Sequence, residues 1–103
     1  MEIFELTKTF PEEEEFGLIS QMRRAAYSIP MNLIEGCNRL NTKEYRRFVG
    51  KAKGSTGEIS YQIFLARDLG YVSGEIYTGL AKKYKIVIKM LWNWAKSLGK
   101  KAQ

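Results

Sequence analysis

The sequence predicts an all-α protein: an antiparallel up-down four-helix bundle with a short first helix, forming a single domain over residues 1–103. Apolar residues recur at intervals of three and four along nearly the whole chain, and no useful length alternates apolar with polar residues as a strand does. Proline and glycine divide this pattern into segments whose short connections favour antiparallel neighbours. With 103 residues, of which 45% are apolar, the chain is large enough for one hydrophobic core.

The first two expected helices are separated by Pro11. The first spans residues 2–9 and has apolar residues on one side, namely Ile3, Leu6 and Phe10. The second spans residues 13–35 and begins with glutamates, which suit the positive end of a helix dipole. Its inward stripe consists of Leu18, Met22, Ala25, Ile29 and Leu33. Because Pro30 lies inside this stripe, the segment is expected to be either one kinked helix or two helices.

The last two expected helices have clearer ends. The third starts after the N-cap residue Asn41, with Glu44 as its capping-box partner, and stops at Gly70. Its inward positions alternate steps of four and three, as in a bundle seam: Tyr45, Val49, Ala52, Thr56, Ile59, Ile63 and Ala66. The fourth is expected from Ser73 to Gly99, with an inward stripe of Tyr77, Leu80, Tyr84, Val87, Leu91, Ala95 and Leu98.

The composition excludes most catalytic chemistry. The chain has no histidine and one cysteine, Cys37, which rules out imidazole catalysis, the usual metal sites and an intrachain disulfide. Its one dense set of carboxylates, residues 12–15, is a consecutive run rather than a converging pair. We therefore expect no enzyme, no cofactor and no metal. The acidic start "MEIFEL" and the lack of any apolar run near 20 residues predict a soluble, cytoplasmic protein.

The stretch "GKAKGSTGE", residues 50–58, resembles a phosphate-binding loop at first sight. A Walker-type loop needs four residues between its glycines and a lysine directly after the second, because that lysine must reach the nucleotide phosphates. Here three residues separate Gly50 from Gly54, and Ser55 follows. The seam of the third helix also passes through this stretch, so nucleotide binding is not predicted.

Small residues on one flank of the third helix predict a close helix contact. At about 100° per residue, a flank away from the seam collects Gly50, Gly54, Gly57, Tyr61 and Leu65. Another subunit is the favoured neighbour, and a helix of the same chain is the alternative. Met90 and Trp94 on one shoulder of the fourth helix also favour self-association, because so short a chain can hardly cover that apolar surface alone.

Two sets of basic residues predict an anionic partner. A lysine ridge falls within an arc of about 60° on the fourth helix, opposite its core stripe: Lys82, Lys85, Lys89, Lys96 and Lys100. The segment after Glu75 contains no acidic residue, although a helix adapted only for solubility usually interleaves glutamate. A second set lies at and after the start of the third helix: Arg39, Lys43, Arg46, Arg47, Lys51 and Lys53.

Nucleic-acid phosphates are the favoured anion for these sets, and an acidic protein is the alternative. A membrane surface is least favoured, because the lysine ridge lies opposite the stripe that the bundle must bury. No sequence-specific recognition module is present, so binding is expected to depend on charge and shape.

The sequence of the middle of the chain resembles that of a known protein family. The segments "SQMRRAAYSIPMNLIEGCNR", "KEYRRFVGKAKGSTGEISYQ" and "ARDLGY" are similar to a bacterial four-helix-bundle family. That family includes the 23S ribosomal RNA intervening-sequence proteins and the accessory variability determinant of diversity-generating retroelements. The close match covers residues 10–71, and the first helix is shortened relative to the family. Polar positions that match its pattern are interpreted mainly as structural pairs: Arg24, Asn32, Glu35 and Glu58.

The resemblance implies a homopentamer without catalytic residues. It also implies a basic surface that, in the retroelement members, engages nucleic acid and a partner reverse transcriptase. The resulting hypothesis is a non-enzymatic, homo-oligomeric protein that binds RNA or DNA through backbone phosphates. It would serve as an accessory factor to a reverse transcriptase or as a protein encoded by an rRNA intervening sequence. The alternative is a protein-protein interaction scaffold that does not bind nucleic acid.

Overall fold

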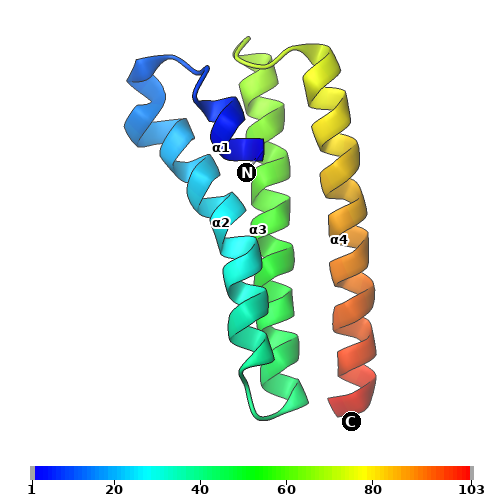
Figure 1. The fold of residues 1–103 in the computed structure, drawn as a ribbon. Helices are drawn as coiled ribbons and strands as arrows, with labels where there is room; N and C mark the ends of the chain where they lie inside the picture. Colours follow the sequence, from blue (N-terminus) through cyan, green and yellow to red (C-terminus); the bar gives the residue numbers. More distant parts are fainter. Residues whose placement is uncertain (1, 103) are drawn as a thin grey trace.

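Three long helices run antiparallel to their neighbours, and a short N-terminal helix lies across part of one face (Figure 1). The computed structural model describes the backbone of residues 2–102 and the side chains of residues 2–99. The helices are α1 (Glu2–Thr7), α2 (Ser20–Cys37), α3 (Thr42–Asp68) and α4 (Gly74–Ala102). Within residues 2–102 there is no strand, which confirms the predicted all-α class. The central helix, α3, packs against both α2 and α4, and the molecule measures 47 × 24 × 17 Å.

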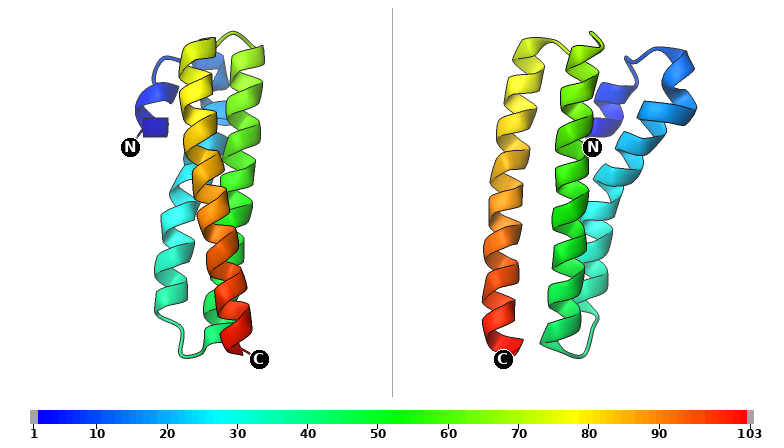
Figure 2. Two further views of the ribbon diagram at one scale, coloured as in Figure 1. Left: turned by 90° about the vertical axis from the view of Figure 1, so that its right-hand side faces the viewer. Right: turned by 180° about the vertical axis from the view of Figure 1, so that it is seen from behind.

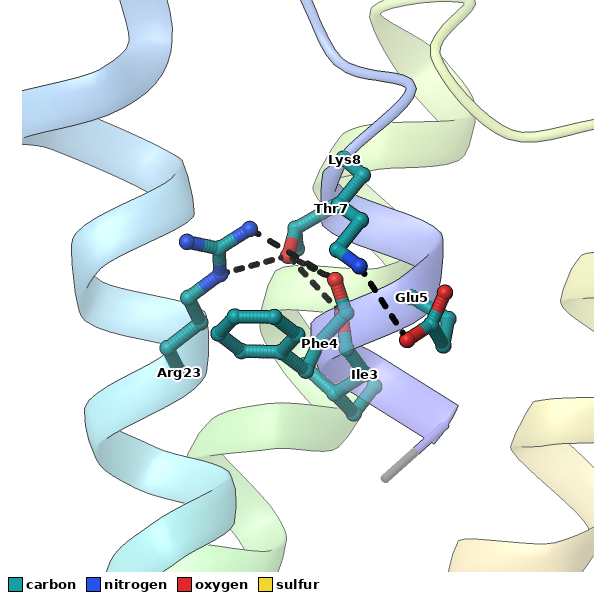
Figure 3. A network of polar contacts seen from close by, with 6 residues as sticks. All are labelled: Ile3, Phe4, Glu5, Thr7, Lys8 and Arg23. Atoms are coloured by element: carbon teal, nitrogen blue, oxygen red, sulfur yellow. Dashed lines mark hydrogen bonds and ion pairs between the residues drawn. The ribbon is translucent and has the colours of Figure 1, made fainter.

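The N-terminal helix is anchored by one arginine of α2 (Figure 3). Arg23 Nε donates a 2.8 Å hydrogen bond to Thr7 Oγ1, whose side chain is only 1% exposed. The Arg23 guanidinium also lies 4.1 Å from the centroid of the Phe4 ring. Helix α1 ends at Thr7, two residues earlier than predicted, because the Thr7 and Thr9 hydroxyls bond to preceding carbonyl groups in a closing turn.

The segment before α2 differs from the prediction. A helix was expected from residue 13, but residues 12–19 form a 3₁₀ turn, η1 (Glu12–Glu14), and a π turn, η2 (Glu15–Ile19). Gly17 departs from helical geometry with φ −106° and ψ −106°, which a residue with low helix propensity tolerates. A long-range contact holds this segment in place, because the Tyr71 hydroxyl donates a 2.8 Å hydrogen bond to Glu14 Oε2. This bond raises the pKa of Tyr71.

Helix α2 passes through Pro30 without interruption, which decides between the two expected arrangements in favour of one helix. Pro30 is exposed, and nearby Asn32 Nδ2 donates a 2.8 Å hydrogen bond to the Ser28 carbonyl. Proline removes one backbone donor from the helix, and α2 continues with that one hydrogen bond missing. The interpretation of Asn32 as a structural residue agrees with its bond to Ser28.

The ends of α3 agree with the predicted signals. Asn41 Oδ1 accepts a 2.8 Å hydrogen bond from the Glu44 backbone N–H, so Asn41 is the N-cap. At the other end Gly70 has φ 82°, the left-handed conformation that glycine adopts without strain. The backbone N–H groups of Gly70 and Tyr71 bond to the carbonyls of Arg67 and Ala66 at 3.0 and 2.9 Å, which forms a Schellman motif.

The core consists of two clusters along α3. The larger one joins α1, α2 and the first half of α4 around the fully buried Ile59 and Ile63. The smaller one lies nearer the start of α3 and joins Val49 and Ala52 to Leu91 and Leu98. The predicted inward stripes are therefore buried or half-buried throughout. Helix α4 continues past its predicted stop at Gly99 to Ala102, because a glycine lowers helix stability without ending a helix.

Within the described residues, no helix is long and apolar enough to cross a membrane.

Candidate nucleic-acid interface

Four residues of the second predicted basic set meet in one pocket between the first half of α3 and the last part of α4. We call it the basic pocket; its volume is about 480 Å³, and it is lined by Lys43, Glu44, Arg46, Arg47, Gly50, Lys53 and Ala95. Helix spacing explains why α3 contributes so many cations, because residues three or four apart share one face. Four cationic side chains therefore surround this pocket, together with a single carboxylate.

Contacts with α4 fix two of these cations. Arg46 Nε donates a 3.1 Å hydrogen bond to the Ala95 carbonyl, and the guanidinium lies over Gly99. Lys53 Nζ lies 4.0 Å from the centroid of the Trp92 ring. The carboxylate of the pocket, Glu44, is 3.9 Å from Arg47 Nη1, at the outer limit of an ion pair. The cations thus have a defined arrangement but little neutralising charge.

The other members of the second set surround Phe48, on the neighbouring side of α3. Arg39, Lys51 and Arg47 lie 4.6, 4.8 and 5.4 Å from the centroid of the Phe48 ring, and Phe48 is buried. Each distance is within the range of a cation-π contact. Since Arg47 also lines the basic pocket, the pocket and the Phe48 cluster form one continuous basic surface at the start of α3.

The predicted lysine ridge extends along the outer side of α4. Lys82, Lys85, Lys89 and Lys96 are exposed, and none of them forms an ion pair with any carboxylate of the described side chains. The side chain of Lys100 lies outside the described residues. Trp92 lies three residues after Lys89 and four before Lys96, so its contact with Lys53 links the ridge to the basic pocket.

The glycines of the α3 flank are open, whereas Leu65 at the end of the flank is half-buried against the larger core cluster. A Cβ added to Gly50, Gly54 or Gly57 meets no heavy atom within 4 Å, and Tyr61 on the same flank is 66% exposed. The alternative in which a helix of the same chain fills this flank is therefore wrong for the described residues. The expectation of a contact with another subunit on this flank stays a prediction.

Met90 and Trp94 lie on a different face from the glycines. Lys83 Nζ forms a 2.8 Å ion pair with Glu2 Oε2, so that side of α4 faces α1, and Met90 follows on the same side two turns later. In Figure 1 the helix α1 covers only part of the front face, and α4 continues well beyond it. Met90 is 65% exposed there, and Trp94 packs edge-on against Tyr45 at a centroid distance of 5.4 Å.

Tyr45 is opposite the glycine flank, because it is nine positions before Gly54 and nine steps of about 100° amount to two and a half turns. The predicted oligomer interface thus consists of two separate faces. Figure 2 shows α3 and α4, the helices that carry these residues, from the side and from behind. The Cys37 thiol hydrogen-bonds to the Tyr45 hydroxyl at 3.3 Å and raises the pKa of Tyr45 to about 12.

Two polar positions that match the family pattern each pair with a residue four positions later in the chain. Glu35 forms a 3.1 Å ion pair with Arg39, and Glu58 Oε1 accepts a 3.3 Å hydrogen bond from Gln62 Nε2. Arg24 lines a second pocket of about 480 Å³ together with Glu58 and Ser28. Ser28 and Ser55 share a hydrogen bond across the α2–α3 contact.

The residues missed by sequence reasoning are the aromatic partners of the cations. Phe48 was not identified at all, although Lys51 three residues later is a helical neighbour that suggests the contact. Trp92 was likewise not among the predicted site residues. Its partner Lys53 is on another helix, and no local signal in the sequence predicts that pair.

Comparison with known protein families gives a match over most of the chain. The model of a family described as 23S rRNA-intervening sequence protein matches residues 1–93 of the chain. No curated protein matches it.

Proposed function

Because this chain belongs to the family of 23S rRNA-intervening sequence proteins, we propose that it is a non-enzymatic, homo-oligomeric protein whose basic surface binds the phosphate backbone of nucleic acid. The observation that carries the proposal is the basic pocket, in which Lys43, Arg46, Arg47 and Lys53 meet around a single carboxylate. Like charges held this close repel one another, and a bound anion removes that cost.

Phosphate fits the donors of the pocket. The arginine guanidinium offers two parallel N–H groups to phosphate oxygens, and lysine adds a compact positive charge. The site is also extended: the Phe48 cluster continues it on one side, and the lysine ridge on the other. An extended row of cations matches a polyanion better than a single small anion. Because these are contacts to the backbone, binding should be largely independent of sequence.

Self-association is the second part of the proposal, and we assign it to the face around Met90 and Trp94. Methionine and aromatic residues are enriched in protein interfaces. On α2, the stretch of residues 27–34 contains no charged residue and exposes Ile34 (56%) and Met31 (40%). A second copy of the chain would cover this apolar surface, while the charged faces of the two copies would remain apart. The pentameric state, the cytoplasmic location and the reverse transcriptase partner stay predictions.

The rival function is a protein scaffold, which the same exposed apolar face favours. Charge-removal variants distinguish the two functions. We expect Lys43→Gln with Arg47→Gln to weaken binding of a fluorescently labelled RNA by about tenfold or more at low salt, because two phosphate contacts are lost. The triple variant Lys82→Gln, Lys85→Gln and Lys89→Gln tests the contribution of the ridge in the same anisotropy assay.

The matched control removes two charges at the opposite end of the bundle, with Lys8→Gln and Arg67→Gln. Neither residue lines the basic pocket, and each forms its ion pair with an acidic neighbour in the same stretch of chain. Lys8 also lies over the Phe4 ring and Arg67 over the Phe64 and Tyr77 rings, so circular dichroism must first show that the control variant is folded. Equal loss of affinity in the control and the pocket variant would mean that only the net charge matters, and would contradict a phosphate site. Undetectable binding of RNA and DNA by the unmodified protein at low salt would favour the scaffold.

A further inference from the structure

An exposed tryptophan lies at the edge of the basic pocket. Trp92 is 52% exposed, and Lys53, which lines the pocket, has its Nζ 4.0 Å from the centroid of the Trp92 ring. One lysine therefore touches both the space for an anion and the face of an aromatic ring. Trp94, two residues later on the same helix, packs against Tyr45 instead and lies on another side of α4.

Cations also border Trp92 along α4. Lys89 is three residues before it and Lys96 four residues after it, so both lie within about 60° of Trp92 around the helix axis. Both are exposed, and neither forms an ion pair with any described carboxylate. The aromatic ring thus lies between the lysines of the ridge and the cations of the pocket.

A flat aromatic ring next to a basic groove is the arrangement that proteins use to bind single strands, where phosphates follow the cations and unpaired bases stack on the ring. A duplex offers the same phosphates, but its bases are stacked on each other and do not reach a ring on a helix surface. We propose that the basic pocket holds the phosphates of a single-stranded nucleic acid while Trp92 stacks on one of its unpaired bases. This inference rests on the proposed function and names the form of nucleic acid that the site selects.

The stacking contribution can be separated from the charge contribution. Replacing a stacking aromatic residue by alanine typically costs about 5- to 150-fold in affinity per base. We expect Trp92→Ala to weaken binding of a single-stranded oligouridylate of about 16 nucleotides by this factor, and to change binding of a duplex of equal length by less than about twofold. Trp92→Phe, which keeps a ring, should restore most of the lost affinity.

Two single-tryptophan variants give a fluorescence readout that does not depend on the stability of the alanine variant. The chain has two tryptophans, so Trp94→Phe leaves Trp92 as the only one, and Trp92→Phe leaves Trp94. We expect unlabelled oligouridylate to quench the emission of the Trp94→Phe protein and to leave that of the Trp92→Phe protein unchanged. Stacking on Trp92 predicts this difference, and a purely electrostatic contact does not.

The outcomes are distinguishable. Tight single-strand binding that Trp92→Ala does not weaken, or a loss of equal size with the duplex, would overturn the stacking inference and leave the phosphate site intact. Equal quenching of both single-tryptophan proteins would also overturn it. No binding of either form at low salt would overturn the proposed function together with this inference.

Discussion

Alanine substitutions on the glycine flank test whether this surface of α3 is open, as the structure shows it. Gly54 and Gly57 are exposed positions in the middle of a 27-residue helix, and an added Cβ meets no heavy atom within 4 Å at either. A glycine inside a helix costs about 0.5–1 kcal/mol relative to alanine. The double variant Gly54→Ala, Gly57→Ala should therefore raise the free energy of unfolding by about 1–2 kcal/mol.

For a domain of this size each kcal/mol corresponds to about 4–8 °C in the melting temperature, so the change is easily measured by circular dichroism. Gly36→Ala is the matched control with the opposite sign. Gly36 is buried, and its added Cβ would lie 2.9 Å from Tyr45 Cδ1 and 3.0 Å from Phe48 Cβ. Because Phe48 Cβ is next to the backbone and cannot move aside, crowding should outweigh the gain in helix propensity, and we expect a net loss of about 1 kcal/mol.

A double variant that melts at a lower temperature than the unmodified protein would refute the open flank. If its mass in solution also decreased, another subunit would have to pack against these glycines, as the sequence first suggested. A Gly36→Ala protein as stable as the double variant would refute the argument from close contacts.

Three further predictions concern the face around Met90, the anchoring of α1 and the response to alkaline pH. Met90→Glu should dissociate the oligomer in analytical ultracentrifugation. The control Leu40→Glu, at a fully exposed position in the α2–α3 connection, should not. Equal masses for the two variants would argue against the face around Met90 as the oligomer interface. Arg23→Ala should lower the free energy of unfolding by about 1–2 kcal/mol and speed hydrogen exchange in α1 but not in α3. The control Lys8→Ala breaks only an exposed ion pair and should lower it by less than about 0.5 kcal/mol. Folding raises the pKa values of Tyr45, Tyr71, Tyr84 and Lys83, so their contribution to stability is complete below pH 10 and is lost as the pH rises toward 12. Urea unfolding near neutral pH and at pH about 11 measures this loss. The same free energy of unfolding at both pH values would contradict the prediction.

The ends of α3 could be predicted because their signals are local. Asn41 and Gly70 act through hydrogen bonds to residues within one turn, and no distant contact changes them. The start of α2 could not be predicted in the same way. Its 3₁₀ and π turns depend on Glu14 meeting Tyr71, 57 residues later in the chain, and on Phe10 packing against the same ring at 5.3 Å.

In the candidate site, too, local features could be predicted from the sequence and long-range contacts could not. Helical spacing correctly grouped the lysines of α4 and the cations of α3, because each group lies on a single helix. The meeting of these groups depends on how α3 and α4 are aligned, so the Lys53–Trp92 contact and the Arg46–Ala95 hydrogen bond had no sequence signal. The separation of Met90 and Trp94 from the glycine flank has the same cause. The angular position of a residue around its own helix does not show how that helix is oriented relative to another helix.

The most direct test of phosphate binding is the salt dependence of affinity for a single-stranded RNA, measured by fluorescence anisotropy over a series of salt concentrations. Each phosphate neutralised on a single strand contributes about −0.7 to the slope of log K against log salt concentration. The basic pocket alone offers four cations, which predicts a slope of about −3, and contacts with the ridge would make it steeper. A slope near zero, or no binding at the lowest salt concentration, would contradict the account.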